Sequence, residues 1–189
     1  MIVPAKKEDV QQVMPLIHAA IGDIAYTLTA AQDEQEAMNI LADFYVEKGN
    51  RLSYEHVLVA WEGDAIAGMA LGYGGDEAAK LDAPLLARIR HQEPSYTDDY
   101  QIMTEARPGE YYLDSIAVYP AYQGKGIARA LISALEHKAR EAGWPCVSLI
   151  ALDDNEKATA LYIRLGYAED GELELAGHRY IRMVKQLSQ

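Results

Sequence analysis

The chain has one cysteine, no long apolar run and few basic residues, and each shortage excludes a class of protein. Cys146 has no partner for an internal disulfide, and it lies in the apolar run 146–152, which predicts a buried strand. No apolar stretch reaches the roughly 18 residues of a membrane span. The first nine residues lack the charged and then apolar order of a signal peptide. We therefore expect a cytoplasmic protein with no membrane partner.

Basic residues are outnumbered by acidic ones, 17 to 29, so the formal net charge is −12. Nucleic acids and anionic membranes would repel such a surface, and neither is expected as a partner. The same charge favours encounter with a cationic or neutral substrate. The five histidines show no ligand spacing, so no metal site is expected.

Strands and helices alternate along the sequence, which predicts an α/β fold in a single domain, 1–189. The expected strands are 2–5, 56–61, 65–73, 111–118, 146–152, 167–175 and 178–185. The expected helices are 8–28, 33–48, 83–91, one that begins at 127 and one that begins after 155. Pro15 should kink the first helix or delay its start. The acidic, tyrosine-containing stretch 76–108 is interpreted as an insertion between the third and fourth strands.

The segment Gln123-Gly124-Lys125-Gly126-Ile127-Ala128 is the most informative part of the chain, because it joins a strand to a strongly periodic helix. A helix N-terminus carries unpaired N–H groups and a partial positive charge, and glycines let an anion come close to them. The segment is neither a Walker motif, which needs Ser or Thr after Gly-Lys, nor a dinucleotide fingerprint, which needs a third glycine. It therefore predicts a cradle for a phosphate, or otherwise a tight turn.

With the pattern Gln-x-x-Gly-x-Ala in this segment, the chain resembles the GNAT superfamily of acyl-CoA-dependent N-acyltransferases. A second motif, from Asn155 through Tyr162 to Gly166 and Tyr167, is similar to another coenzyme-side element of that superfamily. Asn155 is a good N-cap, and Gly166 a good helix stop. The resemblance is strong over about 111–167. It implies a mixed central sheet of about six to seven strands with flanking helices.

The resemblance also implies acetyl-CoA as co-substrate and an N-acetyltransferase that acts on a small-molecule amine or a protein amino group by direct transfer. It assigns the pantetheine arm to the backbone of Ile116, Ala117 and Val118 and to Asn155, the pyrophosphate to residues 123–128, and the role of general acid to Tyr162. The alternative is a non-catalytic acyl-CoA-binding or sensing module with the same fold. A homodimer through a sheet edge stays open.

Residues 112, 114, 116 and 118 should share one face of their strand. Asp114 is the first candidate for the general base, because it lies on that face two residues before Ile116, where the resemblance implies a base. A hydrogen-bonded strand carboxylate that orders a neighbouring loop is the alternative of equal weight. Tyr112, Glu110 and Glu105 are further candidates for the base. The insertion residues Tyr96, Asp98, Asp99, Tyr100 and Glu105 could form a substrate lid or a solvated loop.

Overall fold

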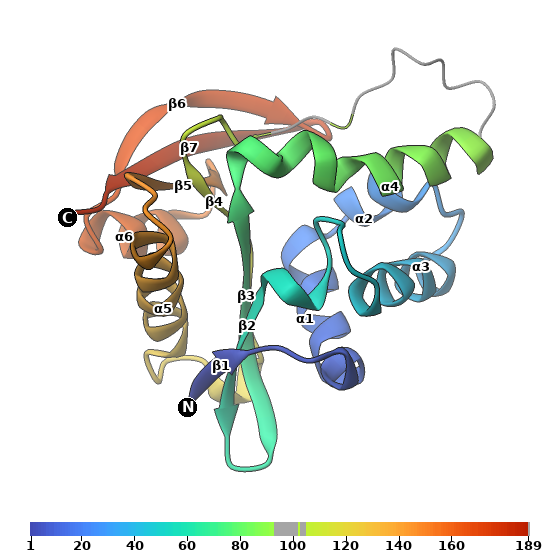
Figure 1. Cartoon of the computed structure of the whole chain (residues 1–189). Helices are drawn as coiled ribbons and strands as arrows, with labels where there is room; N and C mark the ends of the chain where they lie inside the picture. Colours follow the sequence, from blue (N-terminus) through green and yellow to red (C-terminus); the bar gives the residue numbers. More distant parts are fainter. Residues whose placement is uncertain (93–101, 103–104, 189) are drawn as a thin grey trace.

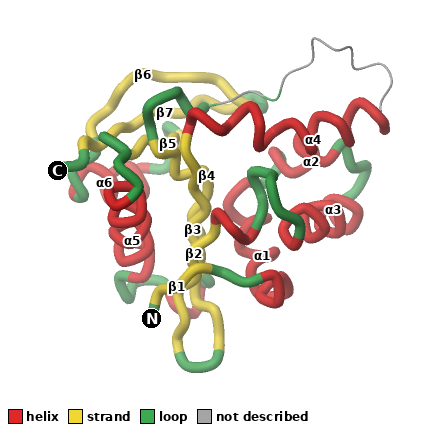
Figure 2. The backbone as a smooth tube through the Cα atoms, in the orientation of Figure 1, coloured by secondary structure: helices red, strands yellow, loops and turns green. Residues whose placement is uncertain are grey.

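The computed structural model describes residues 1–92, 102 and 105–188, which form a mixed sheet between two groups of helices (Figures 1 and 2). The strands are β1 (Ile2–Pro4), β2 (Val57–Glu62), β3 (Ala65–Gly74), β4 (Tyr111–Val118), β5 (Cys146–Leu152), β6 (Ala168–Leu175) and β7 (His178–Gln186). The helices are α1 (Val10–Ile21), α2 (Ile24–Thr29), α3 (Glu34–Val46), α4 (Ala78–Gln92), α5 (Ile127–Glu141) and α6 (Glu156–Arg164). No described helix is long and apolar enough to cross a bilayer.

The seven strands follow the order β1-β2-β3-β4-β5-β7-β6, and β4 and β5 are the parallel pair in a sheet that is otherwise antiparallel. Helices α1 to α4 lie on one side of the sheet, and α5 and α6 lie on the other (Figure 1). Each side has its own apolar core. One core contains Leu16, Leu41 and Tyr112, and the other contains Leu131 and Leu149. The predicted α/β class and mixed seven-stranded sheet are confirmed.

The parallel pair of β4 and β5 separates soon after it begins. Its ladder joins Tyr111 to Val147 and Tyr112 to Ser148, and no later pair of the two strands is bonded. From Leu113 onward, the edge of β4 that faces β5 therefore has backbone N–H and C=O groups without a strand partner. Such an edge can receive an extended ligand as though it were an added strand.

β4 also contains a bulge, and this bulge contradicts the expected alternation of its side chains. Leu71 pairs with Ser115 and the next residue, Gly72, pairs with Leu113, so Asp114 is the extra residue. An extra residue reverses the facing of the side chains that follow it. Tyr112 accordingly lies in the core under α1 to α4, whereas Ile116 packs against the core under α5. The prediction that residues 112, 114, 116 and 118 share one face is wrong.

Two glycines of β3 allow α5 to pack close to the sheet. A Cβ atom on Gly68 would lie 3.3 Å from Leu131 Cδ1 and 2.8 Å from the Ala117 carbonyl oxygen. One on Gly72 would lie 2.8 Å from Leu135 Cδ1 and 2.8 Å from the Tyr112 carbonyl oxygen. Both Leu131 and Leu135 are fully buried, so α5 could not keep this position over larger residues.

Two helices differ from their predicted bounds. The predicted helix 8–28 is two helices, because Gly22 has φ of +51° and interrupts the chain between α1 and α2. Pro15 lies inside α1, and the helix already begins at Val10, so the start is not delayed. α4 begins at Ala78 rather than at residue 83, because the buried side chains of Leu81 and Asp82 hold its first turns against the protein.

We expect Gly72→Ala to lower the free energy of unfolding by about 1 to 3 kcal/mol, because the new methyl group meets both a backbone oxygen and a packed leucine. Urea denaturation measures this loss. Ala65→Val adds more volume at the half-buried start of the same strand and should change stability little. Equal stability of the wild type and the Gly72→Ala variant would show that α5 does not depend on this close approach.

Candidate functional site

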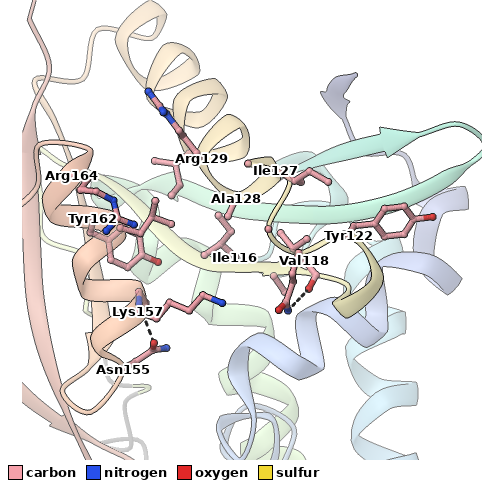
Figure 3. A pocket seen from close by; sticks show the side chains of 17 residues that line it. Ile116, Val118, Tyr122, Ile127, Ala128, Arg129, Asn155, Lys157, Tyr162 and Arg164 are labelled. Carbon is pink, nitrogen blue, oxygen red and sulfur yellow. Dashed lines mark hydrogen bonds between the residues drawn. The ribbon is translucent and has the colours of Figure 1, made fainter.

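A cavity of about 420 Å³ lies where β4 separates from β5, between the N-terminus of α5 and helix α6 (Figure 3). Its walls come from three segments that are distant in sequence: the end of β4 with Ile116, Ala117 and Val118, the segment 122–129, and α6 with the residue before it. Both sequence motifs therefore line the same cavity. Of the predicted cofactor-binding residues, those in the cavity wall are Ile116, Ala117, Val118, Gln123, Gly124, Gly126, Ile127, Ala128, Asn155 and Tyr162.

The loop before α5 has the backbone of an anion cradle. Gly124 and Gly126 have φ of +77° and +80°, which favour glycine, and no protein atom lies within 4 Å of a Cβ built on either. Gly126 is the N-cap of α5, and no side chain caps the helix. The first N–H groups of α5 are thus available to an anion in the cavity. Gln123 donates through Nε2 to the Val118 carbonyl oxygen at 3.1 Å, which ties the loop to β4 (Figure 3).

Among the described residues, three cations and no carboxylate line this cavity, in a protein whose net charge is −12. They are Arg129 on α5 and Lys157 and Arg164 on α6. Such a local excess of positive charge attracts a polyanion. Sequence reasoning missed Lys157 and Arg164. Their spacing of seven residues, two helical turns, was the signal that both lie on one face of α6.

Lys125 is a further predicted cofactor-binding residue of the segment 123–128. It is not among the described residues of the cavity wall, and its Nζ lies 5.1 Å from the centre of the Tyr122 ring. The N–H groups open to an anion are those of its neighbours at the start of α5.

Asn155, which precedes α6, and Tyr162 within α6 both line the larger cavity. The Asn155 side chain accepts a hydrogen bond from the Ala158 N–H at 3.1 Å, which is the predicted N-cap. Tyr162 is buried, its ring meets that of Tyr167 edge to face at 5.8 Å, and burial raises the pKa of its phenol to about 12. At neutral pH this phenol keeps its proton and can donate it.

A second, smaller cavity of about 160 Å³ adjoins the first. Ile116, Asn155, Ala158 and Tyr162 line both cavities and form their common wall. The smaller cavity is also lined by Asp114, by Ala20 of α1 and by Tyr180 of β7. Two molecules could thus be held on either side of Tyr162.

Asp114 has three hydrogen-bond partners, of which Ser115 also lines this second cavity. Its Oδ1 accepts from Arg51 Nη2 at 2.6 Å and from the Tyr73 hydroxyl at 3.3 Å, and its Oδ2 accepts from Ser115 Oγ at 3.4 Å. Arg51 also pairs with Asp82 of α4 at 3.2 Å. These contacts join the turn after α3, helix α4 and the bulge of β4.

Sequence reasoning missed Arg51 and Asp82. Arg51 is 63 residues from Asp114, and no motif links the two. Of the predicted lid, Glu105 is described and its side chain is 7% exposed, whereas Tyr96, Asp98, Asp99 and Tyr100 lie outside the described residues.

Residues 23–167 match the model of the acetyltransferase (GNAT) family. Acetyltransferase SG1711 of Sodalis glossinidius is 40% identical over 75 residues, which are 40% of this chain and 51% of that protein. The match thus spans about half the length of that curated relative.

Two solved structures are similar over nearly all of their length. One, a crystal structure described as an acetyltransferase, has a TM-score of 0.80 and 28% identity and covers 100% of both chains. The other is an N-acetyltransferase from Staphylococcus aureus Mu50, with a TM-score of 0.80 and 25% identity over 97% of this chain and 99% of that one.

The excess of cations in the larger cavity predicts that it binds inorganic pyrophosphate. We expect pyrophosphate to raise the unfolding temperature of the wild type, and Lys157→Gln to weaken binding roughly tenfold, which is about 1.5 kcal/mol for one charged hydrogen bond. Lys7→Gln removes an exposed lysine outside the cavity wall and should bind like the wild type. Equal losses in the two variants would mean that only the net charge matters.

Proposed function

Since the chain belongs to the acetyltransferase (GNAT) family, we propose that it moves the acetyl group of acetyl-CoA directly to a primary amine of a small molecule or a protein. One observation carries this proposal: the two coenzyme-side motifs line one cavity, and Tyr162 separates that cavity from a second one. A donor and an acceptor could then meet at a single side chain. Direct transfer needs both of them bound at once.

The larger cavity suits coenzyme A in shape and in charge. The unpaired edge of β4 at Ile116 and Val118 would bond the amides of the pantetheine arm, and Asn155 would hold the arm from α6. The pyrophosphate would rest on the N–H groups at the start of α5. Arg129, Lys157 and Arg164 would balance the remaining phosphate charge.

Acetyl-CoA supplies a thioester, whose carbon an amine can attack. A neutral amine attacks this carbon and the carbon–sulfur bond breaks. The nitrogen then gives up one proton to solvent, and the departing thiolate must gain one. We assign the second task to Tyr162, because its phenol is buried in the common wall and keeps its proton at neutral pH.

The role of Asp114 is better explained by its contacts than by base catalysis. Both of its oxygens already accept hydrogen bonds, and the strongest of these ties it to the buried Arg51. We therefore assign to Asp114 the alternative that the sequence left open, a carboxylate that holds neighbouring segments in place around the acceptor cavity.

Acetyl-CoA at about a hundredfold above its dissociation constant should stabilise the wild type by about 2.7 kcal/mol. The rise in unfolding temperature should vanish in Gly126→Glu, where a carboxylate enters the anion cradle. Gly63→Glu is the matched control, because Gly63 also has positive φ and open space around it but lies in the turn between β2 and β3. A Gly126→Glu variant that still responds would remove the cradle from the proposal, and a wild type without response would remove the cofactor.

Tyr162→Phe should lower kcat about 10²- to 10⁴-fold, because the thiolate loses its proton donor. The acetyl-CoA response in thermal unfolding should persist, since the ring is kept. Thiol release with a panel of amines measures kcat. Tyr119→Phe, which loses a hydroxyl bonded to the Gln12 carbonyl oxygen, is the control. Binding of acetyl-CoA without thiol release from any amine would favour the sensing module instead.

A further inference from the structure

Contacts of its ring, and no hydrogen bond among the described residues, hold the side chain of Tyr162 in the common wall. The side chain lines both cavities and points from α6 into the larger one (Figure 3). Burial accounts for the raised pKa of its phenol, and no described residue bonds its hydroxyl. A tyrosine ring is set by two side-chain torsions, which packing must then fix. The neighbours of this ring therefore decide where its hydroxyl lies.

The ring of Tyr167 is such a neighbour. The two rings meet edge to face, with their centres 5.8 Å apart and their planes at 65°. Tyr167 follows Gly166, whose φ of +93° ends the helical path, and its N–H donates to the Tyr162 carbonyl oxygen at 3.0 Å. An edge-to-face pair has a preferred geometry, so it can orient a ring. Tyr167 thus contacts both the backbone and the ring of Tyr162.

A buried ion pair lies against Tyr167 in turn. Glu136 of α5 accepts from Lys185 Nζ of β7 at 2.6 Å, and these side chains are 8% and 23% exposed. Lys185 Nζ also lies 5.7 Å from the centre of the Tyr167 ring, which is a cation–π contact. Burial and then the charge of Glu136 raise the pKa of Tyr167, so this phenol stays neutral beside the carboxylate. The ring of Tyr167 is therefore held from α5 and from β7.

Glu136, Lys185 and Tyr167 stand behind the site rather than in it. None of the three is among the described residues that line either cavity, so an effect on bound molecules must pass through Tyr162. The same α5 that carries Glu136 begins at the anion cradle, next to Gly126. The cluster thus links the helix of the cradle to the helix of the phenol. A misplacement of about 1 Å between reacting groups can cost roughly a hundredfold in rate.

We propose that Tyr167 is a positioning residue for the phenol of Tyr162, and that the ion pair of Glu136 and Lys185 holds Tyr167 in the required place. The edge-to-face contact orients the Tyr162 hydroxyl toward the sulfur of the bound thioester. When the carbon–sulfur bond breaks, the phenol O–H bond breaks as well, the proton joins the thiolate, and the phenolate regains a proton from solvent. This inference deepens the proposed function and rests on it, because it concerns the same proton transfer.

Tyr167→Leu removes the ring and keeps the position apolar. We expect kcat for thiol release to fall about 10- to 100-fold, because the phenol of Tyr162 loses its orientation. The acetyl-CoA response in thermal unfolding should persist, since the lining of the larger cavity is unchanged. Tyr167→Phe loses a hydroxyl that has no hydrogen-bond partner among the described residues. It should keep kcat within about threefold, because the edge-to-face contact remains. Full kcat in Tyr167→Leu would overturn the proposal.

A double-mutant cycle separates positioning from general damage to the fold. If Tyr167 acts through the proton of Tyr162, Tyr167→Leu should cause no further loss of kcat in the Tyr162→Phe background. The same fractional loss in both backgrounds would show structural damage and overturn the proposal. Tyr45→Leu is the matched control, because Tyr45 is a buried tyrosine whose ring centre lies 6.3 Å from that of Tyr54, outside both cavity walls. It should lower the unfolding temperature and leave kcat unchanged.

Glu136→Gln tests the ion pair. The change leaves Lys185 without its carboxylate, so we expect kcat to fall severalfold in the wild type and not to fall further in Tyr162→Phe. Glu141→Gln, on the same helix, changes an exposed glutamate that pairs with His137 at 3.2 Å, and it should leave kcat unchanged. Unchanged kcat in Glu136→Gln would remove the ion pair from the proposal.

The two proposals fail in different ways. No acetyl-CoA response in the wild type, or no thiol release with any amine of the panel, removes acetyl transfer and the positioning role with it. Full kcat in Tyr162→Phe removes the proton donor and therefore its positioning residue. A defective Tyr162→Phe variant together with a normal Tyr167→Leu variant leaves acetyl transfer in place and removes only the role of Tyr167.

Discussion

β4 and β5 begin as a parallel pair at Tyr111 and Tyr112 and then separate, and both cavities occupy the space beside this separation. A closed sheet would have used every backbone group of β4 in its own ladder. The open edge instead leaves polar groups that a ligand can bond, and helices α5 and α6 lie together on one side of the sheet (Figure 1). The open backbone groups of the site thus result from the incomplete pairing of β4 with β5.

Keeping the strands apart requires support from both sides of the sheet. On one side, Gly68 and Gly72 let α5 lie close enough for its N-terminus to face the open edge. On the other side, Arg51 holds the bulge of β4 through Asp114 and holds α4 through Asp82. The bulge turns Asp114 toward this arginine, while Ile116 and Val118 beyond it pack toward α5. One inserted residue therefore divides β4 into a part that faces Arg51 and a part that packs toward α5.

The sequence alone predicted the features that depend on neighbouring residues, namely most strands and both motifs. Two-residue alternation located most strands, and the N-cap Asn155 and the glycines before α5 located both motifs, because caps and positive φ leave signals within a few residues. The face of Asp114 was predicted wrongly, since a bulge depends on the partner strand and not on the residue itself. Arg51 could not be found, because it is 63 residues from Asp114 and its burial is decided by packing alone.

Among the residues that the structure describes, four side chains form the common wall of the two cavities, so most of the lining belongs to one cavity or the other. Ala20 and Tyr180 face the smaller cavity alone, whereas Arg129, Lys157 and Arg164 face the larger one alone. Under the proposed function, mutations in the first group would change which acceptor is chosen and leave the coenzyme site intact. Over evolutionary time, such a layout would let a lineage acquire new acceptors by changes at a few positions, with the donor chemistry inherited unchanged.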